Sequence, residues 1–312
     1  MSAPVRHVWA ALLVVWVVWG STYLGIKIVV ETLPPLLSAG SRFLVAGVLV
    51  AAILALRGQS LRVTPRELAG CVVAGALLLT FGVGVVHIAE TRIDSSVAAM
   101  IAGTVPLQVI ALRLASRESV SRATRLSTLA GLAGLGLVIA PGLGAGSTAL
   151  GLAIMIAASI SWSTGSFFSG RLGLPRDAFV ATAYEMLVGG LLLTAGALVF
   201  GEWRDLDSAA FAADSIAAWA YLVVFGSLIG FTAYAWLLRV APISLVVTHQ
   251  YVNPLVAIAL GMLVLGERPN PASLLGAFLV VGAVYVAVRA ESPPTPRPGT
   301  AAPRGTPADQ TA

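Results

Sequence analysis

The sequence is poor in charge and in cysteine. Only 11% of its 312 residues are charged and 58% are apolar, whereas soluble domains carry about a quarter charged residues. The mean hydropathy of +0.92 likewise excludes an ordinary soluble fold. The lone Cys71 excludes a disulfide framework or a cysteine-rich metal site within one chain, and we expect it to pack as a small residue in a helix. No cofactor and no metal are expected.

The sequence also lacks the patterns of nucleic-acid binders and of common enzymes. Its pI is near 9.9, but the basic residues lie in short loops between apolar runs and do not alternate with aromatic residues. No H-E-x-x-H, G-x-S-x-G or P-loop signature is present. We therefore expect no nucleic acid as partner, and the high apolar content makes a lipid bilayer the expected partner.

Long apolar runs predict an all-α membrane protein with ten transmembrane helices, because a spanning helix needs about 20 mostly apolar residues. The 32 glycines suit such a bundle, where small residues let helix backbones approach closely. An uncharged linker at 141–148 separates two sets of five helices. The expected spans are 8–30, 35–56, 67–89, 94–113, 123–140, 147–170, 178–200, 215–238, 242–265 and 271–289. Residues 291–312 are rich in proline and predict a disordered tail.

Arginine placement predicts the orientation of these spans. If the amino terminus is cytoplasmic, the cytoplasmic segments hold fourteen arginines, and the opposite loops hold only Arg92, Arg204 and Arg268. An excess of this size is a strong positive-inside signal. We therefore expect a multi-pass protein of a bacterial-type inner membrane, with both termini and the tail in the cytoplasm.

The two sets of spans resemble copies of one unit. Trp19 and Trp162 are 143 residues apart, and so are Arg42 and Glu185. RFLVAG at 42–47 corresponds to EMLVGG at 185–190, and TVPLQVIAL at 104–112 corresponds to VNPLVAIAL at 252–260. Because each unit has an odd number of spans, the second unit enters the membrane from the opposite side. This predicts an inverted repeat, with residues 1–141 and 147–290 as its two domains.

Four segments resemble the EamA-type drug/metabolite transporters. They are WGSTYLGIK (19–27), PPLLSAGSRFLVAG (34–47), SISWSTGSFFSGRL (159–172) and YVNPLVAIALGMLVLGE (251–267). Together with HIAETRIDSSVAA (87–99), they look most like the YedA-like exporter branch of that superfamily. One segment departs from the family pattern, since ALRLASRE (111–118) stands where the first repeat usually has Leu-Gly-Glu. The resemblance implies ten helices as two EamA repeats around a central cavity, and export of amino acids and related small compounds.

Charged residues inside the spans are the first candidates for a substrate site, because a charge at the membrane centre is costly and is retained mainly for function. Arg42 lies about 10 Å inside the second span, at 1.5 Å per residue. It is either a cation that attracts a substrate carboxylate or a side chain that reaches the interface. Glu185 lies at the mirrored depth of the seventh span. It either binds a substrate amine or exchanges protons, or it holds helices together through an internal hydrogen bond or ion pair.

Three further charges, Lys27, Glu31 and Glu90, are predicted at the outer ends of spans. Lys27 is close enough to its helix end for the ammonium to reach water. The two glutamates could pair with Lys27, Arg42 or Arg92 and form an outer gate. The alternative is that all are plain interfacial charges.

Two prolines, Pro106 and Pro254, stand at matching places in the fourth and ninth spans. A proline removes one backbone hydrogen bond and frees a carbonyl, which membranes tolerate only where protein or a water-lined cavity meets the carbonyl. A paired break of this kind marks a binding site in several transporter folds, although a packing kink would leave the same pattern. The polar neighbours of these prolines are Gln108, His249, Gln250 and Asn253.

Trp19 and Trp162 lie deeper than the aromatic belts that flank a bilayer, at related positions in the two units. We expect them to line a cavity for apolar or aromatic substrates. These features predict a secondary transporter that exports small metabolites or drugs by alternating access. The alternatives are an uptake permease or facilitator of the same fold and a membrane-embedded enzyme. The sequence does not decide between a monomer and a homodimer.

Overall fold

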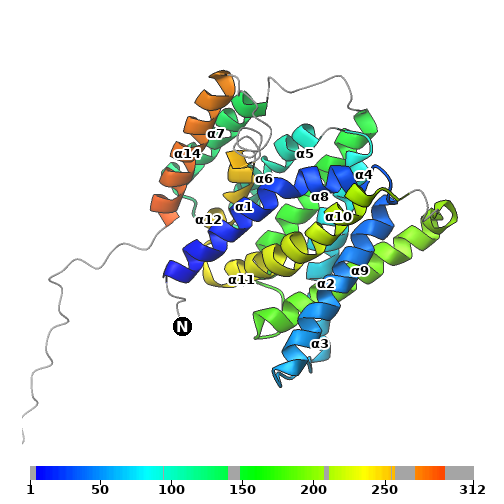
Figure 1. The fold of residues 1–312 in the computed structure, drawn as a ribbon. Helices are drawn as coiled ribbons and strands as arrows, with labels where there is room; N and C mark the ends of the chain where they lie inside the picture. The colour runs from blue at the N-terminus through cyan, green and yellow to red at the C-terminus, as the bar shows by residue number, and fades with distance from the viewer. Residues whose placement is uncertain are drawn as a thin grey trace, which may run out of the picture.

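The computed structural model describes residues 5–93, 95–139, 148–206, 211–253, 255–256 and 271–291. These residues form helices joined by short connections, and none of them is in a strand. The helices gather into one bundle (Figure 1). The expected all-α class is therefore confirmed. The linker at 140–147 and the predicted tail beyond Glu291 lie outside the described residues.

The first half of the chain begins with two long apolar helices and continues with a helix that has a π-helical middle. A capping box starts this third helix, since Thr64 and Glu67 each accept a hydrogen bond from the other's backbone N–H. The elements are α1 (Val5–Val29), α2 (Pro35–Leu56), α3 (Pro65–Ala74), η1 (Gly75–Gly84), α4 (Val85–Glu90), α5 (Ser95–Ala102), α6 (Val105–Ala115) and α7 (Arg122–Ile139).

The second half repeats this order of long and interrupted helices. Thr148 and Asp177 cap the first two of its helices through their side chains, and Gly201, with a φ of +80°, ends the second. The elements are α8 (Ala149–Ser169), α9 (Ala178–Phe200), the 3-10 turn η3 (Glu202–Asp205), α10 (Ala213–Tyr221), η5 (Leu222–Phe231), α11 (Thr232–Val240), α12 (Ile243–Val246) and α14 (Pro271–Glu291).

Six helices of the described residues are long and apolar enough to cross a membrane. They agree with six of the predicted spans within a few residues, and they are Val5–Val29, Pro35–Leu56, Pro65–Glu90, Ala149–Ser169, Ala178–Phe200 and Ala213–Val240. Two of them contain π-helical segments, η1 and η5, of ten residues each, beginning at residues 75 and 222. π-Helical turns are rare and occur mostly at functional sites.

The predicted fourth span, 94–113, is not one continuous helix. It is divided into α5 and α6, with a break at Gly103 and Thr104. Pro106 occupies the first turn of α6, where the missing N–H of proline has no helical partner to lose. Pro106 therefore starts a helix after a break, rather than kinking a helix at its centre.

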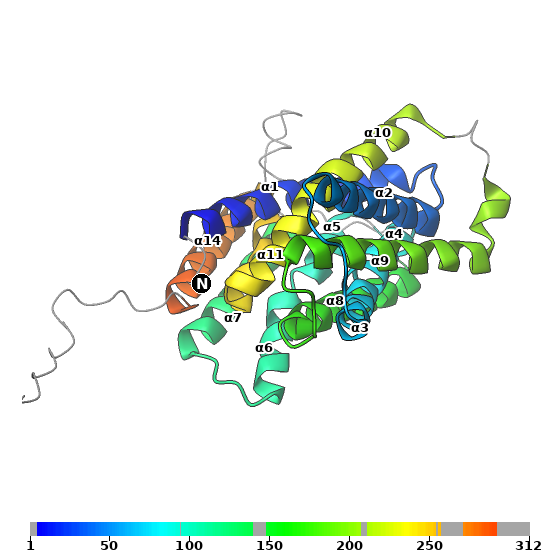
Figure 2. The same ribbon diagram turned by 90° about the horizontal axis from the view of Figure 1, so that it is seen from below.

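Helices from the two halves pack against each other in pairs. The helix α1 contacts η5 and α8 contacts η1, while α2 packs along α9 and α7 along α14. The pair α7 and α14 lies side by side at one edge of the bundle (Figures 1 and 2). The α2–α9 contact is very close, because a Cβ added to Gly190 would lie 2.8 Å from the backbone nitrogen of Leu44. Small residues thus bring the halves together.

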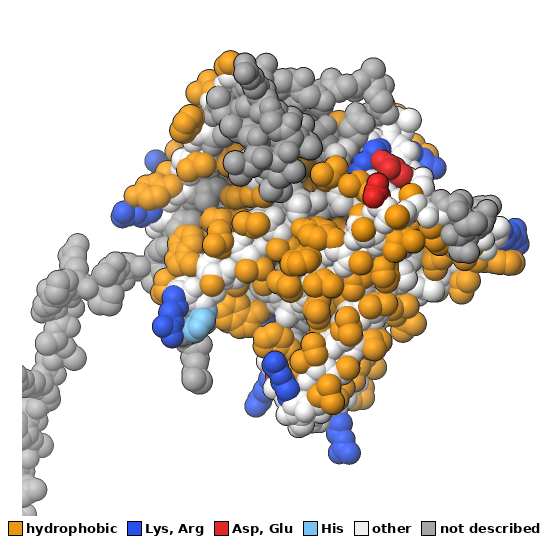
Figure 3. Space-filling view, in the orientation of Figure 1, with side chains coloured by type: hydrophobic (Ala, Val, Ile, Leu, Met, Phe, Trp, Pro, Cys, Tyr) orange, Lys and Arg blue, Asp and Glu red, His pale blue; other side chains and the backbone are white. Residues whose placement is uncertain are grey.

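The outer surface of the bundle is apolar. Leu13, Val48, Leu191 and Phe278 have 58%, 56%, 60% and 76% of their surface exposed. Figure 3 shows hydrophobic side chains covering most of one face, with Lys and Arg at its margins. Soluble monomers rarely expose an apolar patch of this extent, so this surface is suited to contact with lipid.

Candidate functional site

A cavity with about 650 Å³ of empty space, part of it open to the surroundings, lies between the two halves of the bundle. Its wall draws on α1, α2, η1, α4, α8 and η5, and much of it is apolar. The part of α1 that lines it, from Trp19 to Ile26, belongs to the C-terminal half of that helix, so the cavity lies nearer the face where α1 ends. The aromatic lining residues are Trp19, Tyr23, Phe43, Trp162 and Phe231, and the polar ones are Thr22, Arg42, Ser159 and Gln250.

Arg42 supplies the positive charge of this cavity. The side chain is only 3% exposed. Its Nε donates a 3.0 Å hydrogen bond to Oγ of Ser227, and its Cζ lies 4.6 Å from the ring centroid of Phe43. Among the described residues, no carboxylate oxygen lies within 4.0 Å of the guanidinium. A buried guanidinium without a counter-ion favours an anion, because charge burial is costly unless it is compensated.

His87 is a second contact of Arg42, and the sequence analysis did not select it. Its Nε2 lies 3.4 Å from Nη1 of Arg42, and its Nδ1 lies 3.3 Å from Oγ of Ser38. The ring is fully buried. His87 lies two residues before the end of the predicted span 67–89, and because ionisable residues within spans are rare and mostly functional, this rule would have found it. Together with Ser227, it fixes the position of the Arg42 guanidinium.

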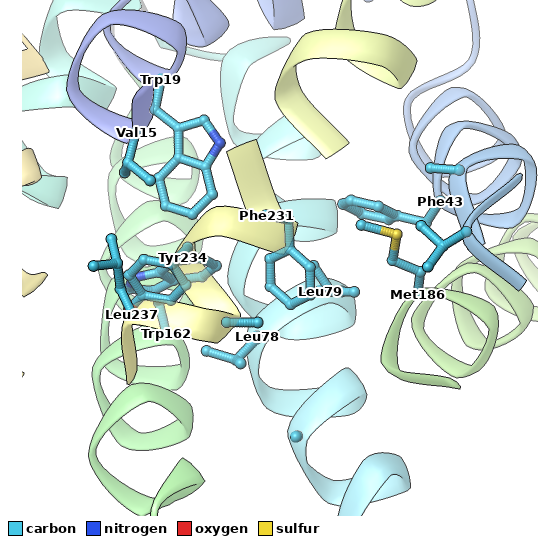
Figure 4. Close-up of a cluster of buried hydrophobic side chains, with 14 of the residues drawn as sticks. Val15, Trp19, Phe43, Leu78, Leu79, Trp162, Met186, Phe231, Tyr234 and Leu237 are labelled. Atoms are coloured by element: carbon cyan, nitrogen blue, oxygen red, sulfur yellow. The ribbon is translucent and has the colours of Figure 1, made fainter. Parts of the chain in front are cut away.

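Four rings form a buried cluster beside the cavity. Trp19 lies 5.3 Å from Trp162, 4.9 Å from Tyr234 and 5.0 Å from His249, measured between ring centroids. Figure 4 shows Trp19, Trp162 and Tyr234 converging from α1, α8 and α11. The hydroxyl of Tyr234 lies 2.6 Å from Oγ of Ser166, one turn further along α8 than Trp162. The cluster thus closes the bundle between the cavity and the end of α8.

The polar residues near the two predicted helix breaks lie around the same region. Gln108 donates through Nε2 to Oγ of Ser159, 3.0 Å away, and Ser159 lines the cavity. Gln250 lines the cavity directly. Asn253 is buried, and its Oδ1 has no hydrogen-bond partner in the described part of the chain. Pro254 lies outside the described residues.

Glu185 does not share the cavity of Arg42. It lines a separate, smaller cavity together with Arg239, Ser169 and four apolar residues. Arg239 donates from Nη1 to the backbone oxygens of Pro175 and Arg176, at 2.7 and 3.2 Å. Glu185 itself is 2% exposed, and its Oε2 has no partner among the described residues. The two residues that correspond in sequence therefore occupy different sites.

The three candidates for an outer gate are placed differently from one another. Lys27 donates from Nζ to the backbone oxygens of Glu90 and Ile93, at 2.8 and 3.3 Å. The carboxyl group of Glu90 is fully buried and has no hydrogen-bond partner in the part of the chain that the structure describes. Glu31 is exposed. The Lys27 ammonium group thus contacts the backbone carbonyl of Glu90 and not its carboxyl group.

An ion cluster joins the two halves at the face of the bundle opposite to Lys27 and Glu90. Glu118, in the loop after α6, bridges Arg113 at the end of α6 and Arg171 just after α8. Arg113 also donates from Nη1 to Oγ of Ser244. Glu118 belongs to the segment 111–118, which departs from the family pattern. This departure is the feature of the sequence that could have pointed to Glu118.

Comparison with known proteins agrees with this architecture. Residues 7–140 and 149–289 each match the EamA-like transporter family. The chain is 35% identical over 277 residues to the inner membrane transporter YedA of Escherichia coli (strain K12), covering 88% of this chain and 89% of that protein. It is 25% identical over 271 residues to the transporter YvbV of Bacillus subtilis (strain 168), covering 86% and 87%.

A solved crystal structure has a similar fold. It superposes with a TM-score of 0.72 at 20% sequence identity and covers 90% of this chain and 96% of its own.

Proposed function

Because the chain belongs to the EamA-like transporter family, we propose that it is a secondary transporter that exports small carboxylate-bearing metabolites or drugs by alternating access. Amino acids and related compounds fall within this class. The observation that carries the proposal is the buried Arg42 guanidinium, which lines the central cavity without a carboxylate among its described neighbours. An anionic group of the substrate supplies the missing counter-charge.

The rest of the cavity favours a substrate with an apolar or aromatic portion. Trp19, Trp162 and Phe231 form much of the wall, and ligand sites commonly combine an apolar lining with a few polar groups that fix orientation. A carboxylate at Arg42 would place the remainder of a small molecule against these rings. Gln250 adds one amide for a further polar contact.

The proposed architecture is ten spans in two inverted repeats of five. Three observations support it: the two family matches, the equal length of η1 and η5, and the pairing of helices between halves. The first helix of each half packs on the π-helical segment of the other, as α1 does on η5 and α8 on η1. Two-fold pseudo-symmetry produces reciprocal contacts of this kind, and an odd number of spans inverts the second unit.

Alternating access requires that one end of the cavity be closed while the other opens. In the proposed orientation, α1 starts in the cytoplasm, so the cavity lies toward the outer face. The four-ring cluster and the bridge through Glu118 then close the cytoplasmic side. Reporters fused at Ala149 and after Arg289 should report periplasm and cytoplasm, and the reverse result would overturn this orientation.

Efflux from proteoliposomes tests the proposed function. The vesicles are loaded with amino acids, small aromatic and aliphatic carboxylates and small amphiphilic drugs, with and without a proton gradient. We expect release of carboxylates by the wild type and strongly impaired release by Arg42→Gln. Arg57→Gln is the matched control, because Arg57 follows the same helix but is exposed. Equal rates for Arg42→Gln and the wild type would overturn the proposal.

A further inference from the structure

Glu90 is a buried carboxyl group that the proposed substrate site does not use. It ends α4 and has no exposed surface. Neither of its carboxyl oxygens has a hydrogen-bond partner among the described residues. Burying an unpartnered carboxylate costs several times more than burying a neutral group. The charge of Glu90 therefore has to be compensated by a nearby cation or removed by a proton.

The nearest cation does not compensate the Glu90 charge by an ion pair. Lys27 directs its ammonium group to the backbone oxygens of Glu90 and Ile93, and no salt bridge within 4.0 Å joins it to the carboxyl group in the described structure. A conventional gate would pair the two side chains directly. This geometry leaves the carboxyl group able to gain and lose a proton without breaking a salt bridge.

The short helix α4 connects Glu90 to the substrate cavity. Val86, one turn before Glu90, lines the cavity, and His87 contacts the Arg42 guanidinium. Tyr23 of α1 also lines the cavity. Glu90 therefore shares one short helix with a cavity residue and with the histidine that contacts Arg42, so a displacement of α4 at Glu90 reaches the substrate site.

The other charged and titratable groups around Glu90 are few. From α1 they are Lys27 and Tyr23, and from α2 the nearest is Arg42, which acts through His87. The helix α8, which packs on α4, has no titratable side chain. Arg92 is exposed and donates to Thr91, and Asp94 lies outside the described residues.

We propose that Glu90 is the proton-coupling site of this transporter, an inference that rests on the proposed function. When outer water reaches Glu90 during the transport cycle, one of its oxygens forms an O–H bond with a proton delivered by hydronium ion, which leaves a water molecule. In the inward-facing state, that O–H bond breaks and the proton passes to cytoplasmic water. One proton then enters as substrate leaves, and the proton gradient drives export.

Labelling with dicyclohexylcarbodiimide tests the site without reference to transport. This reagent adds to protonated carboxyl groups in apolar surroundings. In reconstituted wild-type protein, mass spectrometry should find the adduct on the peptide that contains Glu90, and its yield should fall as the pH rises. The adduct should persist in Asp214→Asn, whose exposed carboxylate is the matched control, and vanish in Glu90→Gln. An unlabelled Glu90, or labelling independent of pH, would overturn the proposal.

The second readout is efflux from proteoliposomes of a carboxylate that the wild type transports. The measured quantity is the ratio of efflux with a proton gradient to efflux without it, which cancels differences in expression. The ratio should exceed one in the wild type and in Asp214→Asn, and the gradient should have no effect in Glu90→Gln. An unchanged ratio in Glu90→Gln overturns the coupling role, whereas no exchange of any carboxylate by the wild type overturns the proposed function instead. If Glu90→Gln transports nothing, the labelling result decides.

Discussion

The Nε atom of Arg42 donates a 3.0 Å hydrogen bond to Oγ of Ser227, and this bond joins α2 to the π-helical segment η5 across 185 positions of the sequence. The neighbouring carbonyl of Gly226 accepts a bond of the same length from Nε1 of Trp19. Two cavity residues from the first half are thus held by consecutive residues of the second half. A movement of η5 shifts both side chains at once.

Removal of the Ser227 hydroxyl should weaken carboxylate binding. Ser227→Ala leaves the buried Nε of Arg42 without its partner, and a hydrogen bond to a charged group is worth about 1.5–3 kcal/mol. We expect KM for carboxylates to rise about tenfold or more, since about 1.4 kcal/mol corresponds to a factor of ten. Steady-state efflux checks this, with the exposed Ser60→Ala as control. An unchanged KM would show that Arg42 does not depend on Ser227.

The tryptophans of the cavity should set the preference for aromatic substrates. Trp162→Ala removes one edge-to-face partner of Trp19, a contact worth about 0.5–1.5 kcal/mol beyond area burial. We expect affinity for aromatic carboxylates to fall more than affinity for aliphatic ones, while Trp162→Phe retains most of it. Trp9→Ala, at a tryptophan that is 40% exposed, is the control. Equal losses for both substrate classes would contradict a direct contact.

The bridge through Glu118 should control access from the side where α6 and α8 end. Glu118→Gln removes the charge that joins Arg113 to Arg171. In a background with Cys71→Ser, a cysteine placed at Ser166, next to Tyr234, reports access to the ring cluster. Its reaction with a water-soluble thiol reagent should be faster in Glu118→Gln than in the parent. Glu67→Gln, at a partly exposed carboxylate in the first turn of α3, should leave the rate unchanged.

The carboxylate of Glu202 should stabilise the start of α2. Its two oxygens accept hydrogen bonds from the backbone nitrogens of Leu36 and Leu37, at 3.1 and 2.9 Å, and so satisfy free donors at a helix terminus. Glu202→Ala should lower stability by about 1 kcal/mol, the usual value of a helix cap. Thermal unfolding in detergent measures the effect. The exposed Glu31→Ala serves as control, and equal melting temperatures for the two variants would argue against the cap.

Close packing of α2 and α9 should make Gly190 intolerant of larger residues. An added Cβ there would lie 2.8 Å from the backbone nitrogen of Leu44, and backbone cannot yield as a flexible side chain does. We expect Gly190→Val to reduce the amount of folded protein severely. Gly136→Val in α7 is a matched control, because no atom lies within 4 Å of the Cβ position there. Size-exclusion profiles of fluorescent fusions report both.

Much of the architecture was predictable from the sequence because the bilayer imposes a simple rule. A span needs about 20 apolar residues, so the composition located the long helices α1, α2, α8 and α9 within a few residues. The break between α5 and α6 lies next to Pro106, which the sequence marked as a helix interruption, whereas an apolar run alone does not show where a helix is interrupted. The ten-span count, the inverted repeat and the orientation stay predictions.

The sequence by itself determined that the chain is a membrane protein, that its halves are related and that Arg42 is an unusual charge in a span. Only the tertiary structure decided which polar groups meet. It placed Arg42 with His87, Ser227 and the tryptophans, and it placed Glu185 in another cavity although the sequence pairs it with Arg42. The physical reason is that hydropathy depends on local composition, whereas a binding site depends on which faces of distant helices pack together. In this chain, glycine contacts and π-helical segments set those faces.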